Sequence, residues 1–238
     1  MSRLLAEVDF ADASQSMSAH ALVSALRELA DPQAAAALTG AISAAVREEQ
    51  WHTAAAALNA LASLGRGAAF AVEVVRPLAD AQDLHVRAAA TAALWELEGE
   101  AAGVVPRLVE LLDTHERHEA AEVLGRIGPA AAPALPRLRT MLTAGYEWTR
   151  VYAAAALWDI GGDAEAPAVV ETLLAAWAEN DATSNHVLAC LSRMGPAARP
   201  ALPRVREELA LLRRSGRFRS ISNDEELQAA CRTITASF

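Results

Sequence analysis

The densest run of potential metal ligands in the sequence is HERHE, which begins at His115. The common helical zinc motif HExxH places two histidines four residues apart, with glutamate next to the first. Here His115 and His118 are three residues apart, and no third ligand is evident. Thr114 fits an N-cap position, while Glu116 and Glu119 fit the positive end of a helix. We therefore expect a solvated helix start, with no metal and no cofactor.

Several kinds of catalytic chemistry are excluded by residue type. All 21 basic residues are arginine, so Schiff-base lysines, phosphate-loop lysines and Ser–Lys pairs are absent. The two cysteines, Cys190 and Cys231, are too few for a disulfide framework or a four-thiolate zinc site, and fit buried apolar positions in a reducing compartment. No phosphate loop, nucleophile elbow or Cys–His–acid set is visible. These features favour a protein that is not an enzyme, although a site assembled between repeats stays open.

Arginines recur beside prolines at the expected starts of helices, in the second, third, fourth and sixth repeats described below. A cation in the first turn opposes the helix dipole by ~0.3–1 kcal/mol, so its recurrence invites an explanation. Each arginine either pairs with a carboxylate of the adjacent repeat, or lies over an apolar surface, or faces an acidic partner on a concave surface. The candidate binding residues of this kind are Arg76, Arg107, Arg137, Arg139, Arg204 and Arg206.

The five tryptophans divide into two kinds by their place in the repeats. Trp95 and Trp158 occupy equivalent positions and are expected to pack between neighbouring repeats. Trp51, Trp148 and Trp177 fall at helix starts or ends, where an exposed indole is a common interface anchor. Packing in the core is the alternative for each of these three.

The charge of the chain is unevenly distributed. The net charge is −9, yet residues 199–219 hold seven arginines against two glutamates, whereas residues 1–198 hold thirteen arginines against twenty-five acids. The basic Arg199–Arg219 region fits contact with nucleic acid or an acidic protein, or a solvated helix and linker. The acidic body favours a basic partner and repels phosphates. The N-terminus lacks the basic start and following apolar stretch of a signal peptide. The sequence also has no uncharged run of the ~20 apolar residues that are needed to span a bilayer. We therefore expect a cytoplasmic, soluble protein with no membrane contact.

These residues are positioned by an internal repeat. GPAAAPALPRLRTML (128–142) and GPAARPALPRVREEL (195–209) share eleven of fifteen residues. A Leu-x-x-apolar element lies upstream of each and recurs six times, ending at residues 29, 64, 97, 127, 160 and 194, with spacings of 35, 33, 30, 33 and 34 residues. A constant period of this length indicates stacked supersecondary units.

Each repeat predicts a pair of helices. A first, alanine-rich helix (the A helix) has apolar residues at helical spacing, as in 86–97 and 150–160, and a second helix (the B helix) begins near a proline such as Pro106 or Pro136. Glycine is expected in the left-handed conformation at the end of the A helix, at Gly65, Gly128, Gly161 and Gly195. One leucine per A helix defines the register of the repeat and is expected to be buried: Leu61, Leu94, Leu124, Leu157 and Leu191.

The pattern VRxxAAxAL…G…PxLxxLL resembles bacterial HEAT repeats, particularly the short HEAT-like type also found in phycobilisome lyases. The residues that match best are Val86–Arg87 with Leu94, Leu97 and Pro106–Arg107–Leu108; Arg150 with Leu157, Ile160 and Gly161 is the next match. The resemblance covers residues 18–215 and implies a right-handed α-solenoid (α-α superhelix) of about six HEAT-like hairpins. Because this repeat serves many roles, the resemblance says little about function.

We therefore expect an all-α chain in three parts: an N-terminal segment (1–17) that is a partial helix or loose, a repeat solenoid (18–215), and a linker with a C-terminal capping helix (216–238). One pair of helices cannot bury its apolar stripe alone, but a stack can, and stacks present concave binding surfaces. The leading hypothesis is a scaffold, adaptor or inhibitor that binds a basic or extended protein partner. The alternatives are a HEAT-like DNA glycosylase or other nucleic-acid-binding protein, and a phycobilisome-type lyase. The oligomeric state stays open.

Overall fold

A computed structural model describes residues 34–211 and 221–238, and every element in these two ranges is a helix or a turn. The chain divides into two compact units, Met1–Ala120 and Ala121–Phe238, which we describe separately. The N-terminal segment (1–17), the first repeat element ending at Leu29 and most of the predicted linker lie outside the described residues. Within the described ranges the all-α prediction is confirmed.

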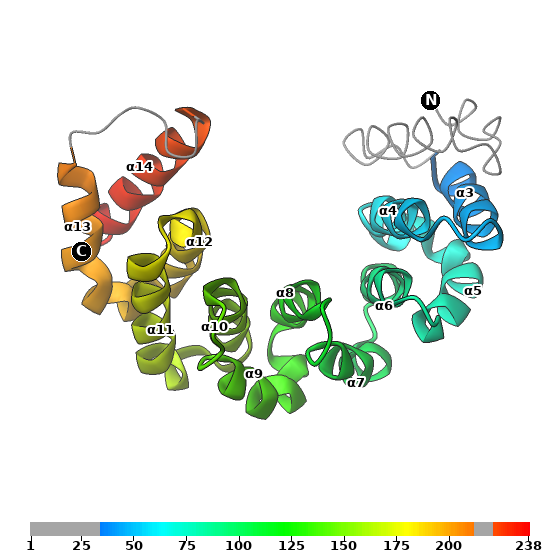
Figure 1. Cartoon of the computed structure of the whole chain (residues 1–238), viewed down its shortest axis with the longest axis horizontal. Coiled ribbons are helices and arrows are strands. Elements are labelled where there is room, and N and C mark those ends of the chain that lie inside the picture. Colours follow the sequence, from blue (N-terminus) through cyan, green and yellow to red (C-terminus); the bar gives the residue numbers. More distant parts are fainter. Residues whose placement is uncertain (1–33, 212–220) are drawn as a thin grey trace. The chain divides into compact units, whose positions relative to one another are not determined.

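In the first unit, helices alternate between two layers. The A helices α4 and α6 lie side by side and pack on each other, while α3, α5 and α7 lie on the other side of them (Figure 1). The short α5 is flanked by two 3₁₀ segments, Gly65–Ala71 and Arg76–Asp80. The bounds of the α-helices are α3 Ala35–Arg47, α4 Trp51–Ala62, α5 Val72–Val75, α6 Leu84–Glu98 and α7 Ala101–Leu111.

The second unit repeats the arrangement. The A helix α10 packs against α9, α11 and α12, and α14 closes the end of the unit by packing on α12 and α13. The bounds are α8 Arg117–Ile127, α9 Leu135–Met141, α10 Glu147–Gly161, α11 Ala166–Glu179, α12 Ser184–Met194, α13 Leu202–Ala210 and α14 Ile221–Ala236. The division between the units falls inside α8, in the repeat whose spacing is shortened to 30 residues.

The cores of both units are built from the register leucines and from alanine. All five register leucines are buried, with no more than 4% of any of them exposed, as the repeat predicted. Alanines fill the A helices around them and let the helices approach closely; α6 alone buries five. The C-terminal helix buries Leu227, Cys231 and Ile234, the three residues predicted to face the core, and packs on α12 and α13. No described helix is long and apolar enough to cross a membrane.

The repeated proline-rich stretch has the same local structure in both copies. Gly128–Ala134 and Gly195–Ala201 are 3₁₀ segments, and each runs into an α-helix whose first turn contains the proline of Leu-Pro-Arg. Gly65, Gly128 and Gly195 have the positive φ expected of a left-handed cap, but Gly195 has a ψ of −127° and so does not take the left-handed helical conformation. The prediction was wrong for Gly161, because α10 continues through it and Gly162 takes the positive φ instead.

A second correction concerns Pro106, which was expected near the start of a B helix. Helix α7 begins at Ala101, so Pro106 lies inside it. Proline lacks the N–H that would bond the carbonyl one turn earlier. On the same turn, the Nη1 atom of Arg107 donates to the Gly103 carbonyl at 2.8 Å. Pro106 therefore lies in mid-helix rather than in the first turn.

A recurring arginine holds the loop before each of three A helices. Arg87, Arg117 and Arg150 lie seven residues before their register leucines. Their guanidinium groups donate to loop carbonyls at Ala81 (2.7 Å), Thr114 (2.6 Å) and Ala144 (2.7 Å) respectively. The arginine of the repeat pattern thus satisfies backbone groups that the turn leaves unpaired.

Candidate functional site

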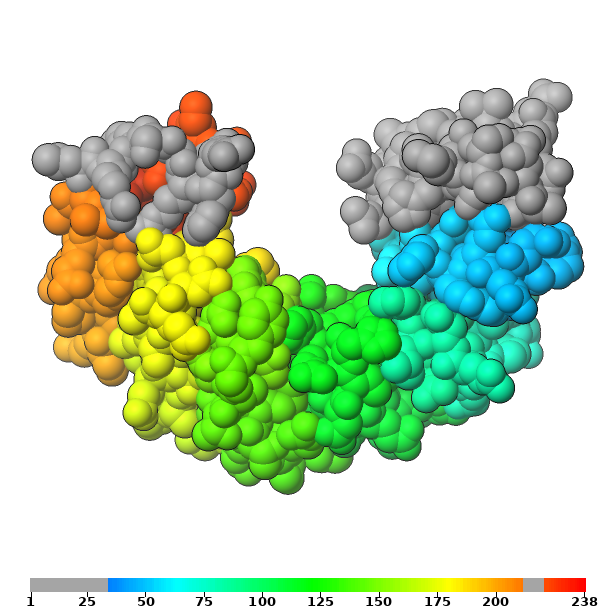
Figure 2. Space-filling model, viewed as in Figure 1, coloured from blue at the N-terminus to red at the C-terminus, as the bar shows by residue number. Residues whose placement is uncertain are grey.

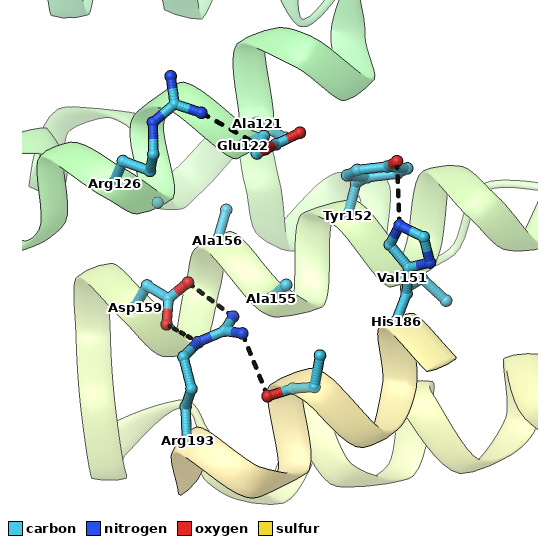
Figure 3. Close-up of a pocket in the computed structure, with 12 residues that line it drawn as sticks. Ala121, Glu122, Arg126, Val151, Tyr152, Ala155, Ala156, Asp159, His186 and Arg193 are labelled. Carbon is cyan, nitrogen blue, oxygen red and sulfur yellow. Dashed lines mark hydrogen bonds and ion pairs between the residues drawn. The ribbon is translucent and has the colours of Figure 1, made fainter. Parts of the chain in front are cut away.

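A groove of about 530 Å³ crosses the A helices of the second unit (Figure 3). In the space-filling view, the helices of this unit form a continuous surface from green to orange (Figure 2). The groove is lined by side chains of α8, α10 and α12, so three successive repeats contribute to it.

The floor of the groove is made of very small residues. Ala121, Gly125, Ala155, Ala156 and Ala189 line it. A Cβ atom at Gly125 would lie 3.3 Å from Oδ2 of Asp159 and 3.4 Å from Cα of Ala156, which is a tight fit. Glycine therefore allows α8 and α10 to approach each other closely.

Gly125 occupies a position that carries tryptophan in two other A helices. Gly125 directly follows the register leucine of α8, and the corresponding residues of α6 and α10 are Trp95 and Trp158. A hydrogen atom thus stands where two other repeats carry an indole. The groove therefore carries no indole at this position of α8.

Two ion pairs form the polar rim. Nε and Nη2 of Arg193 donate to the two carboxylate oxygens of Asp159 at 3.0 and 2.9 Å, and Nη1 of Arg193 donates to the Ala189 carbonyl at 3.1 Å (Figure 3). The second pair, Arg126 with Glu122, is longer at 3.4 Å and lies on α8. The bidentate geometry fixes the Arg193 guanidinium between two helices.

An aromatic cluster stands at the other end of the groove. The ring centroid of His186 lies 5.6 Å from that of Tyr152 and 5.0 Å from that of Trp148. The Tyr152 hydroxyl is 3.5 Å from Nε2 of His186 (Figure 3). Burial, with a further contribution from the negative charge of Glu122, raises the pKa of Tyr152 above its usual value of 10.0. Tyr152 is thus a neutral hydrogen-bonding group at neutral pH.

No serine, threonine or cysteine side chain lines the groove, and its one hydroxyl–imidazole contact, between Tyr152 and His186, is long at 3.5 Å. Cys190, on the buried side of α12, is fully buried, and burial raises the pKa of its thiol to about 12. Such a thiol is protonated and inaccessible at neutral pH, which agrees with the apolar role expected for it. The groove thus combines a floor of small residues, a polar rim and an aromatic end.

Comparisons with known proteins bear on the fold alone. The chain matches no protein-family model and no curated protein sequence. Among solved structures, it is similar to the crystal structure of an engineered protein from the Northeast Structural Genomics Consortium, with a TM-score of 0.51 and 22% sequence identity. The similarity covers 90% of this chain and 67% of that one. At this identity it carries no information on function.

None of the six predicted binding arginines lines the groove. Three of them make the ion pairs between repeats that one of the alternatives predicted. Arg107 bonds Asp80 at 3.1 and 3.2 Å, Arg76 bonds Glu98 at 2.6 Å, and Arg139 bonds Glu165 at 2.5 and 3.2 Å. The carboxylate lies in the preceding repeat for Arg107 and in the following repeat for the other two, and the pairs lie within single units.

The remaining three arginines bond within their own helix or are exposed. Arg137 donates to the Thr140 hydroxyl at 2.5 Å, and Arg206 is exposed. Arg204 lies 3.1 Å from Glu208, a carboxylate that is only 2% exposed, and its guanidinium stands 4.0 Å above the ring of Trp177. Of the basic Arg199–Arg219 region, Arg199 stands 5.5 Å over the Phe238 ring, while residues 212–220 lie outside the described residues.

The three candidate tryptophans have different surroundings. Trp177 is fully buried, so its proposed place as a surface anchor is wrong and the core alternative is confirmed. Trp51 and Trp148 are half-buried. Only Trp148 is in contact with groove residues, through Tyr152 and His186.

Sequence reasoning missed most of the groove, although a signal for it was present. Arg126, Asp159 and Arg193 all lie two residues after a register leucine, and Tyr152 and His186 lie five residues before one. Aligning the repeats by column would have shown opposite charges and adjacent aromatics at equal positions of neighbouring helices. The structure also brings His115 and Glu116 of the HERHE run next to His85, which belongs to the preceding repeat.

Proposed function

We propose that this protein is a non-catalytic interaction scaffold, an α-solenoid of about six HEAT-like hairpins that binds a segment of a partner protein. The groove across α8, α10 and α12 carries the proposal. It is the place where three repeats combine a small-residue floor with fixed polar groups and a half-buried indole. The periodic spacing of the register leucines and their burial support the solenoid.

The groove suits an extended or helical segment with one apolar side chain. Such a side chain would rest on the alanines, where it displaces water from an apolar floor. The Asp159 and Arg193 pair and the Tyr152 hydroxyl supply acceptors and donors for the polar groups of the segment. Trp148 beside them provides the aromatic anchor that interfaces favour.

The charges favour a basic protein partner over nucleic acid. The described residues of the second unit hold thirteen carboxylates against nine arginines, and five of these arginines are paired with carboxylates in the structure. Arginines that are already paired, in a unit with excess carboxylates, offer few free positive charges to the phosphates of a nucleic acid. A basic partner would instead be steered by the net negative field, in a salt-dependent manner. A cytoplasmic location stays a prediction from composition.

The groove can be filled by one substitution on an exposed position. Ala189 lines the groove and is exposed on α12, so Ala189→Trp places an indole in the groove without entering the core. Ala175→Trp is the matched control, because Ala175 is an exposed alanine of α11 outside the groove. Both variants should keep the circular dichroism spectrum and the Tm of the parent chain.

The test begins by isolating proteins of the native host that bind the parent chain and Ala175→Trp. Each is then purified and titrated calorimetrically against all three chains. We expect Ala189→Trp to weaken binding at least tenfold and the affinity to fall as salt is raised. A partner that binds Ala189→Trp as tightly as the parent chain contradicts the groove. Duplex binding or base excision above background would support the glycosylase alternative instead.

A further inference from the structure

A second constellation lies in the first unit, where three donor side chains converge from two repeats. Nδ1 of His85 is 2.5 Å from Oε1 of Glu116, and Nε2 of His115 is 3.1 Å from the same oxygen. The potential ligand atoms of the three residues all lie within 4.8 Å of one another. The imidazole rings of His85 and His115 are 5.1 Å apart and nearly perpendicular.

Local backbone structure places these side chains. Asp83 caps α6 by accepting from the Val86 amide at 3.0 Å, which fixes the first turn that carries His85. Thr114 accepts from the Glu116 amide at 3.1 Å and so fixes the turn before α8. His85 and His115 each lie nine residues before a register leucine, so equal positions of successive repeats bring the two imidazoles next to each other.

The burial of the three groups is unequal in a way that suits a ligand site. The side chain of Glu116 is 10% exposed, whereas those of His85 and His115 are 40% and 61% exposed. The carboxylate therefore stands at the base of the cluster, and the two imidazoles stand at its open side. The surrounding unit is acidic, with twelve carboxylates against six arginines among residues 34–120, and this favours a cation.

We propose that the first unit binds one divalent transition-metal ion of the zinc class through Nδ1 of His85, Nε2 of His115 and a carboxylate oxygen of Glu116. Two imidazoles and one carboxylate form a ligand set that zinc uses, with the fourth tetrahedral position left to water. Ligand atoms bound at ~2.0–2.2 Å in tetrahedral geometry lie ~3.4 Å apart. The two separations from the Glu116 oxygen, 2.5 and 3.1 Å, would have to widen to this value. The two imidazole nitrogens, which lie within 4.8 Å of each other, would have to take the same spacing.

The donor set also selects among metals. Magnesium and calcium prefer oxygen ligands throughout, and imidazole favours zinc and its neighbours in the first transition row. Both thiols of the chain are buried in the second unit, so they do not compete for the ion. The site lies apart from the groove, and it stands or falls independently of the proposed function.

Bound metal would tie the start of α6 to the start of α8. Because an ion that binds only the folded chain stabilises it by mass action, the Tm should rise with zinc concentration. The full chain, freed of any histidine tag and treated with chelator, is titrated with zinc chloride by calorimetry. We expect one ion per chain, a rise in Tm, and a tetrahedral cobalt(II) spectrum without a thiolate charge-transfer band.

The ligand assignment is tested with single substitutions. His85→Ala, His115→Ala and Glu116→Gln should each weaken zinc binding at least tenfold, because each removes one of three ligands. His118→Asn is the matched control: this histidine belongs to the same HERHE run but not to the cluster, and its substitution should leave the affinity within twofold. Circular dichroism confirms that each variant is folded.

Two outcomes would overturn the proposal. In the first, zinc binds neither stoichiometrically nor with a rise in Tm, so that Glu116 serves only as a hydrogen-bond acceptor for the two imidazoles. In the second, zinc binds the folded His85→Ala variant as tightly as the parent chain, so that the ion sits elsewhere. A thiolate band in the cobalt spectrum would point to the same conclusion.

Discussion

The first and second units carry different side chains at the same position of their A helices. Nine residues before the register leucine, α4, α6 and the turn before α8 have His52, His85 and His115, and their rings form a row with centroids 5.0 and 5.1 Å apart. At the corresponding position α10 has Trp148, which contacts Tyr152 and His186 instead. One unit thus presents imidazoles with a buried carboxylate, and the other presents aromatic rings beside a groove.

This difference shows that separate positions of the repeat determine packing and surface chemistry. The register leucine is the same in both units and is buried in both, so it determines packing. The residue nine positions earlier is free to vary, and its chemistry depends on what the next repeat places beside it. A site in this fold therefore belongs to a pair of neighbouring repeats at one position, not to a contiguous motif.

The largest expected effect is the loss of stability when a register leucine is replaced, and it tests whether these leucines determine packing in both units. Leu94→Ala in the first unit and Leu157→Ala in the second should each lower the free energy of unfolding by ~2–5 kcal/mol, because each leaves a cavity in a packed core. Urea unfolding followed by circular dichroism measures this. Leu211→Ala is the control, since Leu211 is 38% exposed, and it should change stability by less than ~0.5 kcal/mol.

Thiol modification separates the two units in the same variants. Cys190 and Cys231 are both buried in the second unit, so their rate of reaction with a thiol reagent reports the opening of that unit. Leu157→Ala should accelerate the reaction ~30-fold or more, which is the effect of ~2 kcal/mol. Leu94→Ala should accelerate it less, because its cavity lies in the first unit while both thiols lie in the second. Equal acceleration by both would show that the units unfold as one.

The sequence predicts features that depend on a single repeat better than features that depend on neighbouring repeats. The periodic leucines, the alanine-rich A helices and the capping helix at Leu227, Cys231 and Ile234 were predictable, because each depends on spacing within a single repeat. Pro106 and Gly161 were misplaced, because helix length is decided by packing and not by the breaker alone. A breaker residue marks where a helix can end, and the neighbouring helices decide whether it does.

The sites were harder to predict than the helices. HERHE offered two histidines with no third ligand, and His85 completes the set from 30 residues away. The arginines after proline looked alike in sequence, yet Arg107 reaches another repeat while Arg137 bonds its own helix. Side-chain partners across repeats depend on the stacking, and a periodic sequence alone does not specify which carboxylate an arginine will meet.

The arginines give a second comparison between the units, with a smaller expected effect. Arg107 and Arg204 follow proline at the same place in the repeat, but Arg107 pairs with Asp80, whose side chain is 68% exposed, and Arg204 pairs with Glu208, which is 2% exposed. Arg204→Ala should cost about 1–3 kcal/mol, because it removes an ion pair made to a buried carboxylate. It also removes the cation over the Trp177 ring.

Thermal unfolding compares three alanine variants at these positions. Arg107→Ala should lower the Tm by clearly less than Arg204→Ala, because exposed pairs contribute little. Arg206→Ala, at an exposed arginine two residues beyond Arg204, should change stability by less than ~0.5 kcal/mol. If Arg107→Ala proves the most damaging of the three, burial of the carboxylate is not what distinguishes these pairs.

The smallest expected effect is the shift in the pKa of Tyr152, which lines the groove. Both tyrosines of the chain, Tyr146 and Tyr152, lie in the second unit, so phenolate absorbance reports that unit alone. In the Tyr146→Phe background only Tyr152 titrates, and its midpoint should lie above ~10 because burial disfavours the phenolate. The folded chain then keeps a proton that the unfolded chain releases near pH 10. The free energy of unfolding should therefore fall as the pH rises through this range.

Two further measurements decide the cause of the shift in the pKa of Tyr152. Glu122→Gln removes a negative charge that adds to the shift, so the midpoint should move part of the way back while burial keeps it raised. The same chain in concentrated urea gives the unfolded reference near ~10. A midpoint at or below this reference in the folded chain would mean that water reaches the Tyr152 hydroxyl freely. The aromatic end of the groove would then be an open surface, and it would differ from the histidine row of the first unit in residue type alone.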